Sequence, residues 1–437
     1  MDLRERLRAL ETRLGVGAPA ARGPLAERPG TLDPLASRSS PPSTPPASSE
    51  TPHASLADRL HRLAARDSSA RKPVDLGALA RSLRGEVCAD GVVVVEQILP
   101  SSHRHGLVAF ERIRDAALEF FAGGTEPDRE SLLFIDTETT GLAGGTGTVA
   151  FVLGLARLRG LHVEVRQYLL TSFAGEAAML THALEWIGAD THLVSFNGKS
   201  FDAPLLATRY LLQLRRDPLA GLPHIDLLHR TRAAFARRWS DCRLQTAEQS
   251  LLKLHRSDDI PGHLIPEMWT TWLRRGDATG LAGVVEHNRI DLLSLIALAA
   301  VLGETYSDPG NEEADPLGLA RAHRRAGDAD GARRHLEACA APLSDEARLE
   351  LAALHAREKQ WHKAVPLWEE LAARQSALAM ERLAIYHEHR SRDLDAALAW
   401  TERLVRAGGD RAGLERRRTR LVQRRERAAS QPLQTDS

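Results

Sequence analysis

Five side chains in the middle of the sequence have the types and spacing that suit metal-assisted chemistry. Asp136 and Glu138 lie two residues apart in FIDTETTG, and on a strand this spacing puts both side chains on one face. Asp202 follows in VSFNGKSFDAPLL. His287 and Asp291 lie four residues apart in VVEHNRIDLLSL, one turn along the same face of a helix. This pattern predicts a shared site with four acids and one imidazole.

The chemistry of such a site follows from its charge. Four carboxylates drawn together repel one another, and each tends to stay protonated unless a cation compensates the charge. Mg²⁺ prefers oxygen ligands from one or two carboxylates and keeps its other positions for water and substrate phosphate. An imidazole with an unperturbed pKa of about 6.5 can take a proton near neutrality. We therefore expect a divalent-cation site beside a general base.

Three segments resemble, in order and spacing, the motifs of the DEDD exonuclease group in the ribonuclease H-like superfamily. These segments are DTETTGL, FNGKSFDAPLL and HNRID. The stretches GLAGGTGT and SDDIPGHLIPEMW are similar to those of the YprB-type ribonuclease H-like domain, and the resemblance covers about residues 85–303. It implies hydrolysis of phosphodiesters with two Mg²⁺ or Mn²⁺ ions, often from a 3′ end.

Carried over position by position, the resemblance implies a catalytic role for each residue. Asp136 would bridge two ions about 4 Å apart, while Glu138 and Asp291 would complete the first ion site. Asp202 would reach the second ion. His287 occupies the position that the histidine variant of the group uses as general base.

Five further residues are expected to contact the nucleic acid. Asn197 and Phe201 flank the third acid and would orient the strand end and pack near the terminal nucleotide. Thr139, Thr140 and Gly141 lie where backbone N–H groups could meet that nucleotide.

Other candidate ligands have plainer explanations. Asp226 in HIDLL could be a further ligand, but the position favours a helix N-cap. His103 and His105 in SSHRHG have no third partner nearby in the sequence, so we expect structural roles for them. Asp258 and Asp259 are expected to shape a turn before the next proline rather than bind metal.

The elements that must position these residues predict an α/β fold. LLFID, AFVLGLARL and HVEVRQYLL read as three consecutive strands, most simply an antiparallel meander. A helix (EAAMLTHALEWI), a strand (HLVSF), a helix opening at residues 202–204 and a short strand ending in HIDLL follow. A helix from about Leu281 to Leu302 ends the pattern. We expect a ribonuclease H-like mixed sheet flanked by helices, at residues 131–305.

Two regions precede this domain. Residues 1–75 combine an amphipathic helix with a disordered Pro/Ser-rich linker, which has too few apolar residues to fold. Residues 76–130 predict lead-in helices and a hairpin. The hairpin is GEVCADGVVVVEQIL, with its turn at Asp90 and Gly91, and ERIRDAALEFF after it has helical spacing.

The sequence after the domain contains an internal repeat. Its units begin at Leu319, Leu351 and Leu383, 32 residues apart. Each unit reads as a helix pair with alanine at a close-packing point, so residues 312–408 resemble tetratricopeptide repeats of slightly short period. The basic tail at residues 409–437 is rich in arginine, and it either binds phosphate backbones or is a solvated tail.

Composition narrows the function classes. Lysine plus arginine and aspartate plus glutamate each number 58, so only local basic patches can indicate a nucleic-acid partner. The three cysteines form no CxxC pair, which speaks against a zinc site and fits a reducing cytoplasm. The longest apolar run, residues 292–302, is too short to span a bilayer, so we expect no membrane contact.

Together these patterns predict a cytoplasmic, metal-dependent nuclease. We expect a 3′–5′ exonuclease that acts on single-stranded DNA or RNA ends, with helical repeats that recruit a protein partner or guide the nucleic acid. One alternative is a non-catalytic nucleic-acid-binding adaptor that recruits partners through its repeats. A second alternative is an endonuclease on structured or hybrid duplexes.

Overall fold

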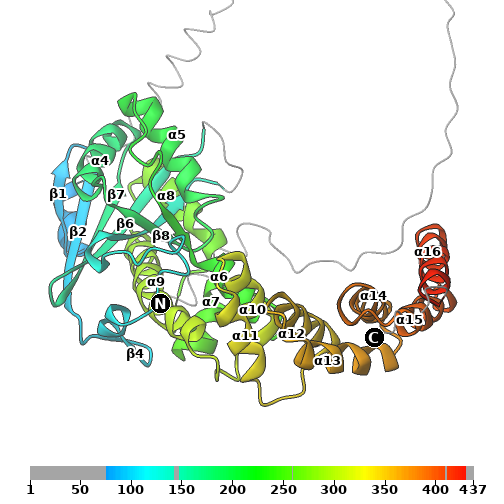
Figure 1. Ribbon diagram of the computed structural model, residues 1–437. Coiled ribbons are helices and arrows are strands. Elements are labelled where there is room, and N and C mark those ends of the chain that lie inside the picture. Colours follow the sequence, from blue (N-terminus) through cyan, green and yellow to red (C-terminus); the bar gives the residue numbers. More distant parts are fainter. Residues whose placement is uncertain (1–74, 142–146, 258, 409–410, 430–437) are drawn as a thin grey trace, which may run out of the picture.

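The computed structural model describes residues 75–141, 147–257, 259–408 and 411–429 (Figure 1). The predicted N-terminal helix and linker, part of the GLAGGTGT segment, Asp258 and the last residues of the basic tail lie outside this described part.

A seven-stranded mixed sheet forms the centre of the larger domain, with the strand order β1-β2-β7-β6-β5-β8-β9. Strands β5, β6 and β7 pair antiparallel as the predicted meander, whereas β8 pairs parallel with β5 and with β9. The mixed sheet predicted from the sequence is confirmed. The strands are β1 (Glu86–Ala89), β2 (Val92–Pro100), β5 (Leu132–Thr139), β6 (Ala150–Arg159), β7 (His162–Leu170), β8 (His192–Ser195) and β9 (His224–Asp226), and β3 (Arg104–His105) pairs separately with β4 (Val108–Ala109).

The predicted hairpin before the meander belongs to the same sheet. Strands β1 and β2 pair around Gly91, whose φ of 76° suits glycine. Strand β2 then pairs antiparallel with β7 along its whole length, and Val92, Val93 and Val94 are buried. The sheet therefore starts well before residue 131.

Helices cover both faces of the sheet. Alternate residues of the strands enter two separate apolar clusters, one packed by α3, α4, α5 and α8 and the other by α6 and most of α9. Figure 1 shows the sheet between these helices. Their bounds are α3 (Leu76–Ser82), α4 (Glu176–Ala183), α5 (Asp202–Leu214), α6 (Leu227–Phe235), α7 (Leu244–Ala247), α8 (Ile265–Arg275) and α9 (Leu281–Ser307).

Helix α9 is the long core helix that carries two of the predicted site residues. In the described part of the chain it is the one helix whose length and mean hydropathy of 1.5 would suffice to cross a membrane. Its apolar window is 72% buried inside the protein, because the helix packs against β5, β6 and β7. Its apolar character is thus explained by the core.

The helix predicted for ERIRDAALEFF is wrong. Only a 3₁₀ segment, η1 (Phe110–Arg114), forms there, and turns follow it. The Arg129 side chain donates to the carbonyl oxygens of Ile113 at 2.8 Å and Ala116 at 2.5 Å. A helix would use these carbonyls for its own hydrogen bonds, so the arginine stabilises the irregular path instead.

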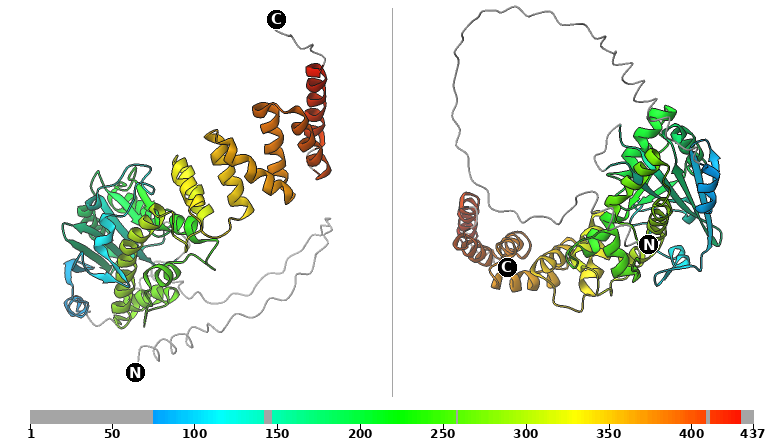
Figure 2. Two further views of the ribbon diagram at one scale, coloured as in Figure 1. Left: turned by 60° about the horizontal axis from the view of Figure 1, so that its bottom comes forward. Right: turned by 180° about the vertical axis from the view of Figure 1, so that it is seen from behind.

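The region after the sheet domain is helical. Figure 2 shows its helices following one another away from the sheet. Leu319, Leu351 and Leu383 are buried, and Ala332 and Ala364 are fully buried where neighbouring helices meet. This agrees with the helical units expected from the repeat, while their tetratricopeptide character stays a prediction. The helices are α10 (Pro316–Arg325), α11 (Ala329–Glu337), α12 (Asp345–Arg357), α13 (Trp361–Ala373), α14 (Ala377–Tyr386), α15 (Leu394–Arg406) and α16 (Arg411–Ala429).

Polar contacts fasten the helical region to the sheet domain. The Tyr306 carbonyl near the end of α9 accepts from His323 Nε2 at 2.9 Å and from His335 Nε2 at 3.0 Å. The Asp315 backbone N–H donates to the Ala234 carbonyl of α6 at 2.7 Å. Both histidines are buried, so this junction is a packed interface with satisfied hydrogen bonds.

Candidate active site

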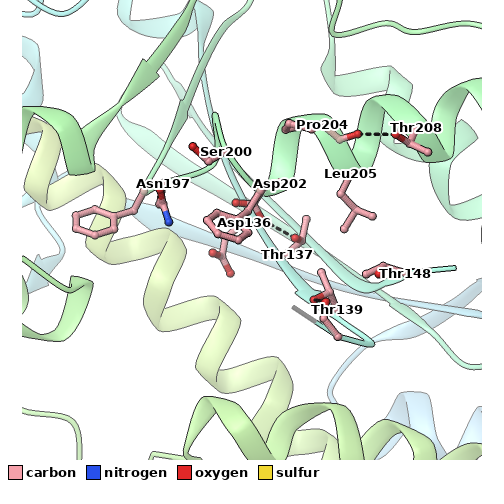
Figure 3. A pocket seen from close by; sticks show the side chains of 13 residues that line it. Asp136, Thr137, Thr139, Thr148, Asn197, Ser200, Asp202, Pro204, Leu205 and Thr208 are labelled. Carbon is pink, nitrogen blue, oxygen red and sulfur yellow. Dashed lines mark hydrogen bonds between the residues drawn. The ribbon is translucent and has the colours of Figure 1, made fainter. Parts of the chain in front are cut away.

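The predicted acids lie on three elements that meet at one edge of the sheet. Asp136 and Glu138 occupy the last half of β5, and Asp202 is the first residue of α5, shortly after β8. Because β5 and β8 are parallel, their carboxyl ends lie at the same edge. Asp136 and Asp202 line one cavity of about 500 Å³, and Figure 3 shows their side chains in it. Asp291 comes from α9, which packs on β5.

Asp136 is held by a relay of two amide side chains. Asn288 Nδ2 donates to Asp136 Oδ2 at 2.7 Å, and Gln167 Nε2 donates to Asn288 Oδ1 at 2.8 Å. Gly154 pairs with Asp136 across the β5–β6 ladder. A Cβ on Gly154 would lie 2.2 Å from Asn288 Oδ1. Glycine is required there because the Asn288 amide passes directly over the strand.

Asp202 is fixed by a residue between the first two acids. Thr137 Oγ1 donates to Asp202 Oδ1 at 2.5 Å, a contact drawn as a dashed line in Figure 3. The turn that leads into α5 is organised by Asp226. Its carboxylate accepts from the backbone N–H groups of Asn197 at 2.8 Å and Lys199 at 3.1 Å. It also caps α6, as the sequence predicted.

His287 lies between the acids and a second group of charged side chains. Its Nε2 is 4.0 Å from Glu138 Oε1 and 3.8 Å from Asp291 Oδ2. Its Nδ1 lies 2.7 Å from Asp259 Oδ1. Arg256 donates to Asp291 Oδ1 and to Asp259 Oδ2, the latter at 3.0 Å.

Burial, together with neighbouring carboxylates, raises the pKa values of the four acids. Burial and the neighbouring carboxylates of Asp291, Glu138 and Asp202 raise the pKa of Asp136 well above its usual range. Burial raises the pKa of Glu138 to about 8, although His287 opposes the shift. Burial also raises the pKa of Asp202 against the hydrogen bond from Thr137, and that of Asp291 against Arg256. Each shift means that negative charge here is undercompensated by the protein.

The pKa of the imidazole moves in the opposite sense to what burial alone would cause. Burial lowers the pKa of His287, but the hydrogen bond to Asp259 and the carboxylates of Asp291 and Glu138 together raise it. The same histidine contact, against the effect of burial, helps to lower the pKa of Asp259. An ionised Asp259 beside His287 is the favoured state.

The donor set suits a hard divalent cation. Carboxylate oxygens are the ligands that Mg²⁺ and Mn²⁺ prefer. The raised pKa values indicate that a bound cation would stabilise the ionised form of these carboxylates. Among the described residues, however, no three His, Cys, Asp or Glu side chains are arranged as they stand to hold one ion. Asp136, Asp202 and Asp291 each use an oxygen for a protein donor instead.

Four of the five residues predicted to contact nucleic acid line the cavity with the acids, namely Thr139, Gly141, Asn197 and Phe201. The Phe201 side chain is 52% exposed, which leaves an apolar ring open at the site. Thr140 does not fit its predicted role. Its backbone N–H donates to the Val149 carbonyl at 3.0 Å, and its hydroxyl accepts from Val149 N at 3.1 Å.

Sequence reasoning missed the residues that hold the acids and the imidazole in place, and three of them show why. Asn288 stands inside the HNRID motif, where its position next to His287 was a usable signal. Asp259 was interpreted as a turn residue, and it does accept from the Ile260 N–H at 2.9 Å, but it also binds His287. Arg256 lies 35 residues before Asp291, and its spacing gave no sign of their contact.

Comparison with known proteins agrees with the fold of this domain. A family model described as RNase_H superfamily matches residues 133–303. The chain is 34% identical over 325 residues to the uncharacterized protein YprB of Bacillus subtilis (strain 168), an alignment that covers 69% of this chain and 78% of YprB. An RNase H-like domain suggests a nuclease, which implies nucleic-acid binding and usually divalent metals. The chain therefore belongs to one family with YprB, and its residues 133–303 form a domain of the RNase_H superfamily.

Proposed function

We propose that this protein hydrolyses nucleic-acid phosphodiesters with the help of Mg²⁺ or Mn²⁺ held by Asp136, Glu138, Asp202 and Asp291. The observation that carries the proposal is the convergence of acids from β5, α5 and α9, with pKa values raised by burial and by one another. Two of these acids, Asp136 and Asp202, line one cavity. An acidic surface without a cation would repel a polyanion. With a bound cation, the same acids become a site for phosphate.

Two bound ions would supply charge stabilisation at the scissile phosphate and at the leaving oxygen. The protein residues do the rest. His287 directs Nε2 toward the acids and takes the proton of the attacking water. The exposed ring of Phe201 offers a stacking surface for a base, and such contacts suit single strands of any sequence.

We further propose that cleavage proceeds from a 3′ end. A cavity of about 500 Å³ is of the size that holds one small ligand, which fits a terminal nucleotide better than the middle of a duplex. The three free cysteines fit a cytoplasmic location. We expect the helical region to guide the nucleic acid or to bind a protein partner.

The test is a nuclease assay with Mg²⁺ or Mn²⁺ on single-stranded DNA, single-stranded RNA and a hybrid, each labelled at one end or the other. The wild type should shorten strands stepwise from the 3′ end, and Asp136→Ala and Asp291→Ala should abolish cutting. The surface substitution Asp330→Asn, at an ion pair with Arg333, is the control and should leave the rate unchanged. Activity that survives both alanine substitutions would discard the catalytic assignment, and internal cuts would indicate an endonuclease.

One observation favours a second candidate function. Because no three potential ligands in the described part of the chain stand ready for an ion, and Asp291 binds Arg256, the domain could serve as a non-catalytic nucleic-acid-binding adaptor. In that case the wild type would bind oligonucleotides without cutting them at any divalent-metal concentration. Asp136→Ala would then bind as well as the wild type or better, since it removes a negative charge.

A further inference from the structure

A network of buried polar groups lies behind His287, and apart from Asp291 its members have no role in the proposed hydrolysis. Arg256 is at its centre, with a side chain only 6% exposed. Its guanidinium contacts the carboxylates of Glu248, Asp259 and Asp291. A buried charge of this kind is costly unless it is fully paired, so a network with one arginine and three acids calls for an explanation.

We propose that Asp259, held in place by Arg256, is a positioning residue that fixes His287 with its proton on Nδ1 and its Nε2 lone pair facing the acids. This inference rests on the proposed function, in which His287 is the general base.

The orientation follows from the hydrogen-bonding capacities of the two partners. A neutral imidazole has one N–H and one lone pair, whereas an ionised carboxylate can only accept. Since His287 Nδ1 lies 2.7 Å from Asp259 Oδ1, the imidazole proton must be on Nδ1. The lone pair is then on Nε2, the atom that lies 4.0 Å from Glu138 and 3.8 Å from Asp291. A base in this tautomer is ready to accept a proton on the side of Glu138 and Asp291.

The hydrogen bonds that hold Asp259 in place continue into the core of the domain. Arg256 Nη1 donates to Asp259 Oδ2 at 3.0 Å, and Arg256 Nε donates to Glu248 Oε2 at 2.8 Å. Glu248 in turn accepts from Ser294 Oγ at 2.5 Å, and Ser294 lies 2.8 Å from His105 Nε2. The structural role predicted for His105 is thus confirmed, because its side chain contacts Ser294 at the end of this network.

The helical region supplies a matched control for the pair. His323 Nδ1 lies 2.8 Å from Asp328 Oδ2, and the His323 side chain is 2% exposed, against 13% for His287. Asp328 also accepts from the Gly331 N–H, as the N-cap of α11. Asp328→Asn therefore makes the same chemical change in a histidine–aspartate pair outside the candidate active site.

The first test reads the tautomer directly in the metal-free full-length protein. Nitrogen-15 NMR of histidine-labelled protein, with the His287 signals assigned through His287→Gln, should show the proton on Nδ1 in the wild type. In Asp259→Asn the new amide can donate to Nδ1, so the proton should move to Nε2. Asp328→Asn should leave the His287 signals unchanged. A His287 proton on Nε2 in the wild type, or an unchanged tautomer in Asp259→Asn, would overturn the proposal.

The second test is kinetic. Asp259→Asn should lower kcat about 100-fold, because a misplaced general base loses most of its contribution, while KM changes less than about 3-fold. Arg256→Lys should cause a smaller loss, since lysine keeps the charge but not the forked geometry. A kcat for Asp259→Asn within about 3-fold of the wild type, with His287→Gln inactive, would overturn the positioning role and leave the nuclease assignment intact. If the wild type does not cut at all, the proposed function fails, and the NMR result still decides the orientation of His287.

Discussion

Two regions of this protein each bring charges of one sign close together, and they differ in how far these charges are exposed to water. At the sheet edge, acids gather around Asp136, whereas on α14–α16 three arginines (Arg417, Arg420 and Arg424) gather around Glu388. The acids Glu138 and Asp291 are each only 14% exposed, whereas the Arg420 and Arg424 side chains are 51% and 42% exposed and Arg417 is 19% exposed. The two clusters carry charges of opposite sign, but the more important difference is that most of the arginines contact water and the acids barely do.

Burial decides whether a charge cluster needs a ligand. Helix α16 contains eight arginines and two glutamates, and most of these arginines face solvent, where water and salt screen their repulsion. The acids of the sheet edge have no such screening, and their pKa values rise in consequence. The exposed arginines of α16 need no ligand to be solvated, whereas our proposal supplies the buried acid cluster with a divalent cation.

Neutralising one charge in each cluster should give the largest difference in catalytic efficiency between two variants. Asp136→Asn should lower kcat/KM for a single-stranded substrate at least about 1000-fold, because it removes a ligand at the centre of the site. Arg424→Gln should change the same quantity less than about 3-fold, since other arginines of α16 remain. Initial rates on one end-labelled oligonucleotide measure both. Equal losses in the two variants would mean that the acid cluster has no special role.

The stabilisation of the folded protein by a bound metal ion should depend on pH, because the acids that would bind the ion are buried. Burial raises the folded-state pKa of Glu138 to about 8, above the value of about 4.3 expected for the unfolded chain. Because the folded value is higher, the stability that this group contributes is present below about pH 4 and is lost as pH rises through about 8. Mg²⁺ should therefore raise the melting temperature more at pH 8 than at pH 6.

Scanning calorimetry of the metal-free and Mg²⁺-loaded protein at the two pH values measures this effect. Glu138→Gln is the matched variant, and it should weaken the difference between the two pH values. A melting-temperature shift of the same size at both pH values would contradict the link between burial and the need for a cation.

The exposed arginines should act through long-range attraction. Arg416 and Arg427 are exposed and lie outside the group around Glu388. Replacing both with glutamine should reduce the slope of log affinity against log salt by about 1.4 for a long single strand, if each contacts one phosphate. Fluorescence anisotropy across a salt series measures the slope. An unchanged slope would identify α16 as a solvated helix.

The smallest effect is expected from the carboxylate that organises α16. Glu388→Gln removes the charge that three arginines share. The Glu388 side chain is 1% exposed, but glutamine fills the same space and keeps one accepting oxygen, and Arg420 and Arg424 can turn to water, so we expect a loss of about 1 kcal/mol in the free energy of unfolding. Urea unfolding measures it, with Glu402→Gln at an exposed ion pair with Arg418 as the control. A loss far larger than this would mean that glutamine and water cannot replace the charge of Glu388 beside these arginines.

Periodicity in the sequence predicted the elements that carry the site. The β5–β7 meander and α9 follow from apolar patterns that local physics enforces, and Asp136 and Glu138 share a strand face for the same reason. The helix expected at residues 111–121 failed because Arg129, from a later segment, binds its carbonyls. A contact between distant segments leaves no trace in local spacing.

The same limit applies to the site itself. The five catalytic candidates were found because a motif resemblance brought them together, but their supporting partners were not. Asp259 lies 28 residues from His287 in the sequence, and Gln167 lies 121 residues from Asn288. Only the folded chain shows that these groups orient the histidine and Asp136.

The central claim is that the buried acids of the sheet edge bind a divalent cation, and calorimetric titration of Mn²⁺ into the metal-free full-length protein tests it most directly. The account predicts saturable binding by the wild type and by Asp330→Asn, and its loss in Asp136→Asn. Binding of equal affinity and stoichiometry in Asp136→Asn, or no saturable binding by the wild type, would contradict it.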